Sequence, residues 1–387
     1  MPGLRNGIIM ARILSSIACN LDANILLAAL PLFESEKIEA IEWSFDTLFQ
    51  HEAVPDWFME LIKEFSQERR LIGHGVFFSL FSGKWSSAQQ DWLRHLAALS
   101  KEFQFDHITE HFGFMTGEDF HQGAPISIPF TPATLALGQD RLKRIQAAAG
   151  CPVGLENLAF AYSLDEVKKH GAFLDQLVES VNGFIILDLH NLYCQIHNFE
   201  LGFAEIIPLY PLDRVREIHI SGGSWQDSRL AARRKIRRDT HDEAVPKEVF
   251  NLLERAIPQC PNLKYVVLEQ LGTGLKTEES RRLFRQDFLQ MAQIVQAGQP
   301  GHPENAGNYF FPKTSGLLDP TPLENELLYA QQVQLSAILE TATSLEAARA
   351  RLQSSRLAHS DWEIEKWEPY MLETALAIAQ KWKHGFR

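Results

Sequence analysis

Cysteine is scarce in this sequence of 387 residues, and the four that occur are scattered. Cys19, Cys151, Cys194 and Cys260 lie far apart, and no two of them form a Cys-x-x-Cys pair. This spacing excludes a dense disulfide framework and a thiolate zinc site of the usual kind. Because such a chain is typical of a reducing compartment, we expect a cytoplasmic protein.

A long apolar run and an excess of basic residues are also absent. The fairly apolar stretch 8–32 is interrupted by Arg12, Asn20, Asp22 and Asn24, so it predicts neither a membrane span nor a signal peptide. Lysine and arginine number 37 against 49 aspartates and glutamates, which gives a formal net charge of −12. That charge argues against general nucleic-acid binding. We therefore expect neither a membrane nor a nucleic acid as a partner.

Hydrophobic residues make up 45% of the chain and include 25 phenylalanines, enough for a large core. From about residue 13 to 299, short apolar runs alternate with longer amphipathic stretches, which is typical of βα units. Eight such runs predict an α/β fold, a closed (β/α)8 TIM barrel over residues 1–298. The predicted strands are 13–19, 40–45, 71–78, 105–109, 152–155, 184–187, 215–220 and 265–268.

The pattern changes after residue 298. The segment 298–303, Gly-Gln-Pro-Gly-His-Pro, consists largely of turn formers and predicts a linker. The chain then becomes helix-rich, with Leu328, Leu335 and Leu339 on one helical face and a last helix at about 362–382. Residues 299–387 are therefore predicted to be a linker and a helical C-terminal extension. The extension is expected to be a cap packed on the barrel or, alternatively, a partner-binding element or lid.

Six consecutive predicted strands end in histidines or carboxylates. Active sites of (β/α)8 barrels gather at the carboxyl ends of the strands. So many ionisable groups at one mouth are costly to bury without compensation, which a cluster of two or three metal ions supplies. Imidazole and carboxylate ligands fit iron, zinc or manganese, and the ligand type does not choose among them. The residues are His74, Asp106, His107, Glu110, His111, Glu156, Asp188, His190, Glu217, His219, Asp239, His241 and Glu269.

The order and spacing of these residues resemble a known family. The pieces Asp106-His107, 154–157 (Gly-Leu-Glu-Asn), Asp188-x-x-Asn191 and Asp239-x-His241 are similar to the multinuclear non-haem iron-dependent oxidase family. That family includes the methanobactin-type peptide-cysteine oxidases. Its barrel resembles those of xylose-isomerase-like proteins and three-zinc abasic-site endonucleases. The resemblance spans roughly residues 10 to 298.

The resemblance implies a ligand set for each metal. One metal is expected on His74, His107 and Glu156, with Glu156 bridging to a second metal. The second metal is expected on Asp188, His219 and Glu269 as well. A third is expected on Asp239 and His241, with Asn191 nearby. The implied metal ligands are His74, His107, Glu156, Asp188, Asn191, His219, Asp239, His241 and Glu269.

Catalytic roles are implied for Asp188, His190 and Asn157. Asn157 is expected to orient Glu156, since ligating carboxylates are themselves usually hydrogen-bonded. His190 stands where the family usually has an amide, so an extra ligand, a proton carrier and a structural substitution all remain open. Asn191 takes the place of a histidine in the endonucleases, and its poorer ligand atom is expected to weaken the third site.

The resemblance implies an enzyme, a non-haem iron oxidoreductase that uses dioxygen. With two or three irons per chain, it is expected to oxidise a cysteine of a ribosomally synthesised precursor peptide in natural-product biosynthesis. A separate protein that recognises the leader peptide is an expected partner. The main alternative is a zinc- or manganese-dependent hydrolase or isomerase on a xylose-isomerase-like barrel. A binding protein that kept the barrel and lost the chemistry is the third class.

A basic run precedes Asp239. Six of the ten residues in 229–238 are arginine or lysine. A solvated loop or helix face is the default interpretation of such a run. Because the run adjoins the predicted mouth of an acidic protein, docking of an acidic peptide segment or of a partner is the alternative.

Overall fold

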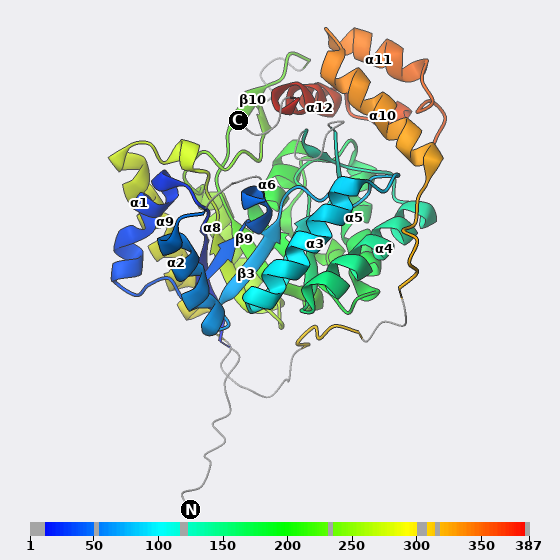
Figure 1. Cartoon of the computed structure of the whole chain (residues 1–387). Coiled ribbons are helices and arrows are strands. Elements are labelled where there is room, and N and C mark those ends of the chain that lie inside the picture. Colours follow the sequence, from blue (N-terminus) through cyan, green and yellow to red (C-terminus); the bar gives the residue numbers. More distant parts are fainter. Residues whose placement is uncertain are drawn as a thin grey trace, which may run out of the picture.

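The protein forms a closed barrel of eight parallel strands surrounded by helices (Figure 1). The computed structural model describes residues 12–49, 54–116, 123–230, 235–299, 308–313 and 318–383. The strands follow one another in the order β1-β12-β9-β8-β7-β4-β3-β2, which confirms the predicted TIM barrel. They are β1 Leu14–Ala18, β2 Ala40–Trp43, β3 Leu71–Gly75, β4 Phe105–His111, β7 Val153–Glu156, β8 Phe184–Asp188, β9 Val215–Ile220 and β12 Tyr265–Leu268.

Several helices around the barrel begin or end at residues that cap their free backbone groups. The Ser86 and Thr131 side chains accept backbone N–H groups at the starts of α3 and α4. Gly150, with φ at +68°, ends α4 in the left-handed conformation that glycine adopts without strain. The helices are α1 Ala23–Glu34, α2 Asp56–Gln67, α3 Ser87–Glu102, α4 Pro132–Ala149, α5 Leu164–Glu179, α6 Leu189–Asn198, α7 Phe203–Ile206, α8 Lys247–Ala256 and α9 Glu278–Ala297.

The loops contain short strands and 3-10 turns. Two hairpins, which the sequence pattern did not predict, interrupt the βα alternation. They are β5 Phe114–Met115 with β6 Pro125–Ile126, and β10 Trp225–Asp227 with β11 Lys235–Arg237. The 3-10 turns are η1 Phe45–Leu48, η2 Ile207–Leu209, η3 Leu212–Arg214, η4 Ile257–Gln259, η5 Gly272–Gly274 and η6 Ile364–Lys366.

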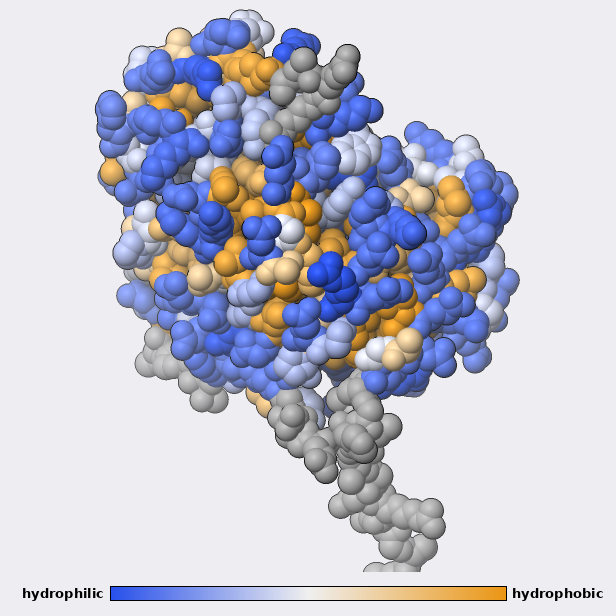
Figure 2. Space-filling model, turned by 180° about the vertical axis from the view of Figure 1, so that it is seen from behind, coloured by the Kyte–Doolittle hydropathy of each residue, from blue (hydrophilic) through white to orange (hydrophobic). Residues whose placement is uncertain are grey.

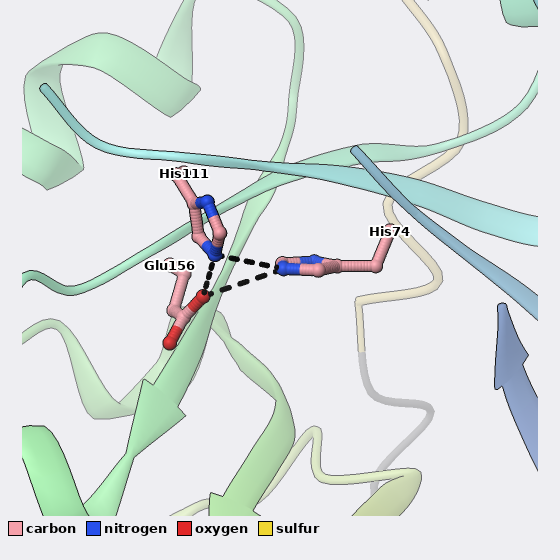
Figure 3. A group of neighbouring side chains, drawn as sticks. All are labelled: His74, His111 and Glu156. Atoms are coloured by element: carbon pink, nitrogen blue, oxygen red, sulfur yellow. Dashed lines mark hydrogen bonds and ion pairs between the residues drawn. The ribbon is translucent and has the colours of Figure 1, made fainter. Parts of the chain in front are cut away.

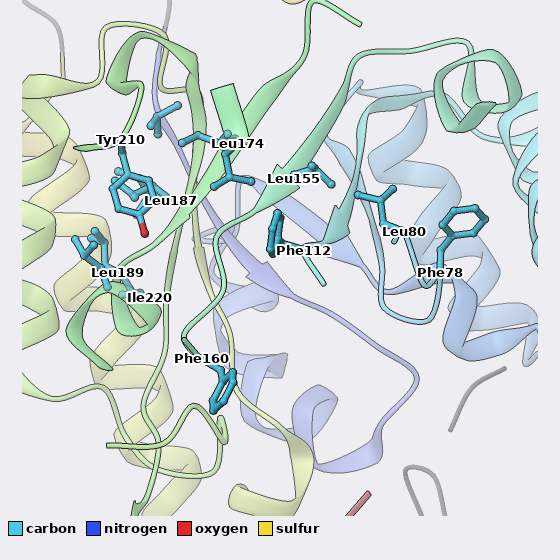
Figure 4. Packing of buried hydrophobic residues seen from close by; sticks show 14 of the residues in the cluster. Phe78, Leu80, Phe112, Leu155, Phe160, Leu174, Leu187, Leu189, Tyr210 and Ile220 are labelled. Atoms are coloured by element: carbon cyan, nitrogen blue, oxygen red, sulfur yellow. The ribbon is translucent and has the colours of Figure 1, made fainter. Parts of the chain in front are cut away.

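The main core lies between the barrel and its helices. Figure 4 shows part of it, in which Leu155 of β7 and Leu187 of β8 pack with aromatic residues such as Phe112 and Tyr210. All four side chains are buried. Burial of this apolar area is the main force that closes the barrel.

A second, smaller apolar cluster includes Ile72, Tyr265 and Val267. Because side chains alternate along a strand, His74 points to the same side as Ile72, and Glu269 to the same side as Val267. Both polar residues stand closer to the carboxyl ends of β3 and β12 than their apolar neighbours. The alternation therefore places polar groups above this apolar layer.

Three helices of the C-terminal extension gather at the upper end of the barrel in Figure 1. They are α10 Glu326–Thr341, α11 Leu345–Gln353 and α12 Pro369–Trp382. The extension is anchored on the barrel loops: the rings of Trp367 and Tyr162 stack at 3.8 Å, and the Tyr370 hydroxyl donates to the carbonyl of Asn198 at 2.9 Å.

The last helix starts later than the sequence predicted. It begins at Pro369 instead of about residue 362, because proline fits the first helical position and keeps the preceding residue, Glu368, extended. Trp362 and Trp367 lie in the segment before the helix, where both are buried.

Apolar side chains also remain on the surface. The face in Figure 2 carries apolar areas bordered by hydrophilic side chains, and α10 exposes Leu327, Tyr329 and Val333. Scattered apolar residues of this kind are ordinary. In the described part of the chain, no helix has both the length and the apolar character needed to cross a membrane.

Candidate metal centre

The carboxyl ends of the strands bring together three overlapping groups of metal-ligand side chains. Within each group the ligand atoms lie within 4.8 Å of one another. Since Glu156 and Asp188 each belong to two groups, the three form one continuous cluster. The groups are His74, His111 and Glu156; Glu156, Asp188 and His219; and Asp188, His241 and Glu269. A fourth group, Glu42, Glu217 and His219, is fully buried and joins the cluster through His219.

The first group is drawn in Figure 3. Oε2 of Glu156 lies 3.5 Å from Nε2 of His74 and 3.2 Å from Nε2 of His111. The two Nε2 atoms lie 3.1 Å apart. Two imidazole nitrogens and a carboxylate oxygen that converge in this way fit the first ligands of a transition-metal ion.

Neighbouring residues turn the histidine lone pairs toward the cluster. The Thr109 hydroxyl donates to the carbonyl of Gly73 at 3.3 Å and can therefore accept from Nδ1–H of His74 at 2.8 Å. This leaves Nε2 of His74 without a proton and free to bind a metal. In the same way Nε2–H of His219 donates to Glu42 at 3.0 Å, which leaves Nδ1 as the ligand atom.

The structure corrects the predicted partner of His74 and Glu156. His107 lies four residues before His111 on β4: the strand register places His107 opposite Ile72, whereas His111 stands opposite Glu156. His107 instead contacts Glu217, with 2.8 Å between Nε2 and Oε2. Its Nδ1 lies 3.0 Å from a carboxylate oxygen of Asp106.

Asp106 belongs to a network at the opposite, amino-terminal end of the strands. Its carboxylate accepts from Arg216 at 2.8 Å and also pairs with Lys264. Burial alone would raise the pKa of Asp106, but the hydrogen bond from His107 and the charge of Arg216 hold it well below its usual value. This network stabilises the barrel below the metal-ligand cluster.

Several buried ligand atoms of the cluster have no hydrogen bond within the described residues. This applies to Oε2 of Glu156, Oδ2 of Asp188, Nδ1 of His219 and Oε2 of Glu269. Buried polar atoms are normally hydrogen-bonded, so unsatisfied atoms that converge on one place fit a bound cation. The donor set of imidazoles and carboxylates therefore suits the metal ions that the sequence predicts.

The electrostatics of the cluster also call for positive charge. Burial alone would lower the pKa of His219, but Glu42, Glu217 and Glu269 outweigh it and raise that pKa well above its ordinary value. Burial and the nearby carboxylate of Glu156 raise the pKa of Asp188. Both shifts reflect negative charges crowded in a dry site, which a cation or a proton relieves.

Two asparagines hold the ends of β7 and β8 in place. Nδ2 of Asn191 donates to Oε1 of Glu156 at 3.1 Å and to the carbonyl of Asn157 at 2.8 Å. The Asn157 side chain instead bonds the backbone of Asp188, accepting from its N–H at 2.6 Å. The expectation that Asn157 orients Glu156 directly is therefore wrong, because Asn191 makes that contact.

His190 contacts the carboxylate of Asp239 and helps to hold it in place. Nε of Arg237 donates to Nε2 of His190 at 3.0 Å, so the ring of a neutral His190 carries its proton on Nδ1. Nδ1 in turn lies 3.1 Å from Oδ1 of Asp239, which also lies 2.7 Å from Nε2 of His241. His190 is fully buried and is not part of the ligand groups.

The sequence analysis did not assign a role to two residues of the site, His111 and Glu42. Glu110-His111 was visible at the end of strand four, but the sequence alone did not show which of His107 and His111 reaches Glu156. Glu42 carried a weaker signal, a carboxylate inside a run predicted to be a buried strand. It is fully buried, and its pKa is raised to about 7, mainly by burial.

The basic run divides into a buried and an exposed part. Arg237 is only 3% exposed and lies over the rings of Trp225 and Tyr193, at 4.9 and 5.6 Å from their centroids. Arg229 and Lys235 are exposed, whereas Arg233 and Arg234 lie outside the described residues. Arg237 is therefore part of the support of the site.

A pocket of about 380 Å³ opens onto the cluster. It is lined by five ligand-type side chains of the cluster and its surroundings, by apolar residues of the barrel loops, and by residues of α12. The five are His111, Glu156, Asp239, His241 and Glu269. The pocket therefore gives a substrate access to the candidate metal ligands.

Comparison with known proteins places the chain in a family. Residues 34–273 match the family described as "RiPP precursor modification enzyme MbnB/TglH/ChrH". A "UPF0276 protein" of Caulobacter vibrioides is 29% identical over 192 residues, which are 47% of this chain and 62% of the relative. Another, from Acaryochloris marina, is 27% identical over 187 residues, 48% of this chain and 64% of the relative. The chain thus spans somewhat less than two thirds of the length of these curated relatives.

Solved structures with a similar course of the chain are more distant in sequence. A xylose isomerase-like TIM barrel protein from Mycobacterium smegmatis in complex with magnesium is 14% identical, with a TM-score of 0.44 over 73% of this chain and 97% of that one. An L-ribulose 3-epimerase is 13% identical, with a TM-score of 0.43 over 91% and 100%. The family match covers more than half of the chain and agrees with the resemblance seen in the ligand pattern: this protein belongs to the MbnB/TglH/ChrH family of RiPP precursor modification enzymes.

Proposed function

We propose that this protein is a multinuclear iron-dependent oxidoreductase that acts with dioxygen on a cysteine of a ribosomally synthesised precursor peptide. The observation that carries the proposal is the continuous cluster of three overlapping ligand groups in a member of this family. Burying so many unsatisfied ionisable atoms at one mouth costs free energy unless a bound cation compensates them. These unsatisfied atoms support our proposal that the chemistry takes place at the cluster.

We assign the residues to metal ions according to the ligand groups described above. His74, His111 and Glu156 would hold one ion. Glu156 and Asp188, each shared by two groups, would bridge to the next, which His219 and Glu269 complete. His241, which is grouped with Asp188 and Glu269, would hold a third ion at the pocket together with Asp239, whose Oδ1 lies 2.7 Å from Nε2 of His241. Nδ2 of Asn191 donates to Oε1 of the bridging Glu156.

When bound, iron of mixed valence supplies dioxygen activation and a Lewis acid for the thiolate of the substrate. The chain's own residues fix the geometry. Asp188 is proposed as a bridging ligand, while Asn157 and His190 act as positioning residues. Pocket walls exclude bulk water around the reacting cysteine, which strengthens every electrostatic interaction inside.

The proposed setting follows from the substrate. A precursor peptide is made in the cytoplasm, and the four cysteines of this chain are free, with Cys19, Cys194 and Cys260 buried. A leader-peptide-recognition protein is proposed as a partner, because the pocket is too small to enclose more than a short piece of a peptide. Natural-product biosynthesis is the proposed context.

The proposal is tested with a cysteine-containing peptide encoded beside the gene. Iron-loaded protein is incubated with the peptide in air and without oxygen, and the peptide is analysed by fragment mass spectrometry. We expect a mass change confined to a cysteine, only in air, and none with its Cys-to-Ser version. A zinc-loaded preparation that hydrolyses or isomerises a substrate, with no oxygen-dependent product from the iron form, would contradict the proposal.

A further inference from the structure

Helix α12 contributes one wall of the pocket that opens onto the metal-ligand cluster. Its lining residues are Met371, Thr374, Ile378, Lys381 and Trp382. Steps of three, four and three residues keep side chains on one face of a helix, so the contribution is a continuous stripe. The pocket is therefore built by two parts of the chain that are far apart in sequence.

The helix lies outside the region shared with the family. The family match ends at residue 273, almost a hundred residues before α12 begins. All candidate metal ligands lie within the matched region. Features of the pocket that come from α12 are therefore the ones most particular to this chain.

Contacts near both ends of α12 hold the helix against the barrel. Before its start, the N–H of Glu368 donates to the carbonyl of Tyr162 at 2.8 Å. In its first turns, the Glu373 carboxylate accepts from the hydroxyl of Ser228 at 2.9 Å. At its end, the carbonyl of Trp382 accepts from the N–H of Gly123 at 3.1 Å. A wall fixed in this way can discriminate between substrates of different shape.

The chemistry of the walls is largely apolar. Met371 and Ile378 face a pocket whose other walls include Phe77, Phe112 and Phe160. Three cations and three carboxylates also line the pocket, so it offers no excess of positive charge to an acidic side chain. They are Arg237, Arg238, Lys381, Glu156, Asp239 and Glu269. An apolar side chain of the substrate therefore gains more from this pocket than an acidic one.

We propose that α12 determines specificity by contacting the residue next to the reactive cysteine and favouring an apolar side chain there. This inference rests on the proposed function, because the cysteine is placed at the metal-ligand cluster. The pocket of about 380 Å³ lies near the lower end of the range for small-molecule sites, about 300–1,000 Å³. It admits the cysteine and a neighbouring side chain and leaves the rest of the peptide outside.

Three capped tetrapeptides test the proposal by calorimetric titration of the metal-loaded full chain. They are Gly-Leu-Cys-Gly, Gly-Asp-Cys-Gly and Gly-Leu-Ser-Gly. We expect the Leu-Cys peptide to bind about tenfold or more tightly than the Asp-Cys peptide, which is the order expected from burial of one leucine side chain. The Leu-Ser peptide is expected to bind more weakly than Leu-Cys, because it lacks the thiol.

Variants then assign the preference to α12. Ile378→Trp fills the pocket and is expected to abolish the advantage of leucine over aspartate, with metal content unchanged. Leu327→Trp is the matched control, because Leu327 is 63% exposed on α10 and does not line the pocket. Leu327→Trp should keep the wild-type preference for leucine. Ile378→Val, which leaves the pocket open, should show most of the preference that Ile378→Trp loses.

The outcomes separate the two proposals. Equal affinity for the Leu-Cys and Asp-Cys peptides, or a leucine preference that survives Ile378→Trp, would overturn the role of α12. Equal affinity for the Leu-Cys and Leu-Ser peptides, with weaker binding of the Asp-Cys peptide, supports the α12 wall and contradicts the cysteine chemistry. Failure of all three peptides to bind contradicts both.

Discussion

At the scale of single residues, His111 and His107 have different tasks although both lie on β4. His111 contacts Glu156 in the ligand cluster, whereas His107 contacts Glu217 and Asp106 below it. We expect His111→Asn to lose the metal held by the first group while the fold is kept. His107→Asn should retain metal but destabilise the barrel by about 3–5 kcal/mol, because it removes the ring that contacts the buried carboxylate of Glu217. Metal analysis and urea unfolding of both variants check this, and the reverse pattern would contradict it.

His190 allows a second test at this scale. Its Nδ1–H is placed to fix Asp239, so His190→Leu should weaken binding of the outermost metal by about 10- to 100-fold. His190→Asn keeps an amide donor near the place of Nδ1 and should recover most of the affinity. Competition with a chelator measures the effect. Equal loss in both variants would mean that His190 only fills space.

The pair on β4 also shows what the sequence could reveal. Period-two alternation and the strand-end rule identified His74, Glu156 and His219 as residues of one mouth. Choosing between His107 and His111 required the register of β4 with both of its neighbours, β7 on one side and β3, whose pairing with β4 contains a shift, on the other. Register is a property of neighbouring strands together, so one strand's sequence does not contain it.

At the scale of secondary-structure elements, the start of α5 carries a half-buried acid. Burial raises the pKa of Glu166 to about 7 from an ordinary value of 4.5, although its carboxylate accepts from the N–H of Tyr162 at 2.7 Å. A raised pKa in the folded state means that Glu166 stays protonated to a higher pH in the folded chain than in the unfolded chain. Stability should therefore fall as pH rises from about 4.5 to 7.

Glu166→Gln removes this titration and keeps an oxygen that can accept the hydrogen bond. Relative to wild type, the variant should gain roughly 1–3 kcal/mol between pH 5 and pH 8. Urea unfolding at both pH values measures the difference. Parallel pH profiles of the two proteins would show that Glu166 does not titrate in this range.

The sequence predicted the long secondary-structure elements well but missed the short ones. The eight predicted strands were confirmed because apolar periodicity marks them locally. The β10–β11 hairpin was missed because Ile236, the middle residue of β11, is a single buried apolar residue inside a basic run. Short elements of this kind depend on the surface they pack against.

At the scale of the whole molecule, the extension and the barrel form one folded unit in which each buries part of the other. Trp367 is 7% exposed, stacks on Tyr162 of the barrel, and donates its ring N–H to the carbonyl of Trp362 at 2.8 Å. No apolar pattern in the sequence showed that α12 would line the pocket, since that depends on contacts across two hundred residues or more, such as the one between Glu368 and Tyr162.

Trp367→Ala tests this coupling. We expect a loss of about 3–5 kcal/mol in the free energy of unfolding, with one calorimetric transition shifted to lower Tm and metal content unchanged. Trp57→Ala is the matched control, because Trp57 is 53% exposed and should cost much less. Two separate transitions in the wild-type protein would contradict a single folded unit.

The most direct test of the metal cluster is elemental analysis combined with Mössbauer spectroscopy. The protein is expressed with iron supplied and purified without a chelator. The continuous ligand cluster predicts more than one iron per chain and a coupled mixed-valent signal. Stoichiometric zinc or manganese, with iron excluded even when it is abundant, would contradict the oxidase and favour a hydrolase or isomerase on the same barrel.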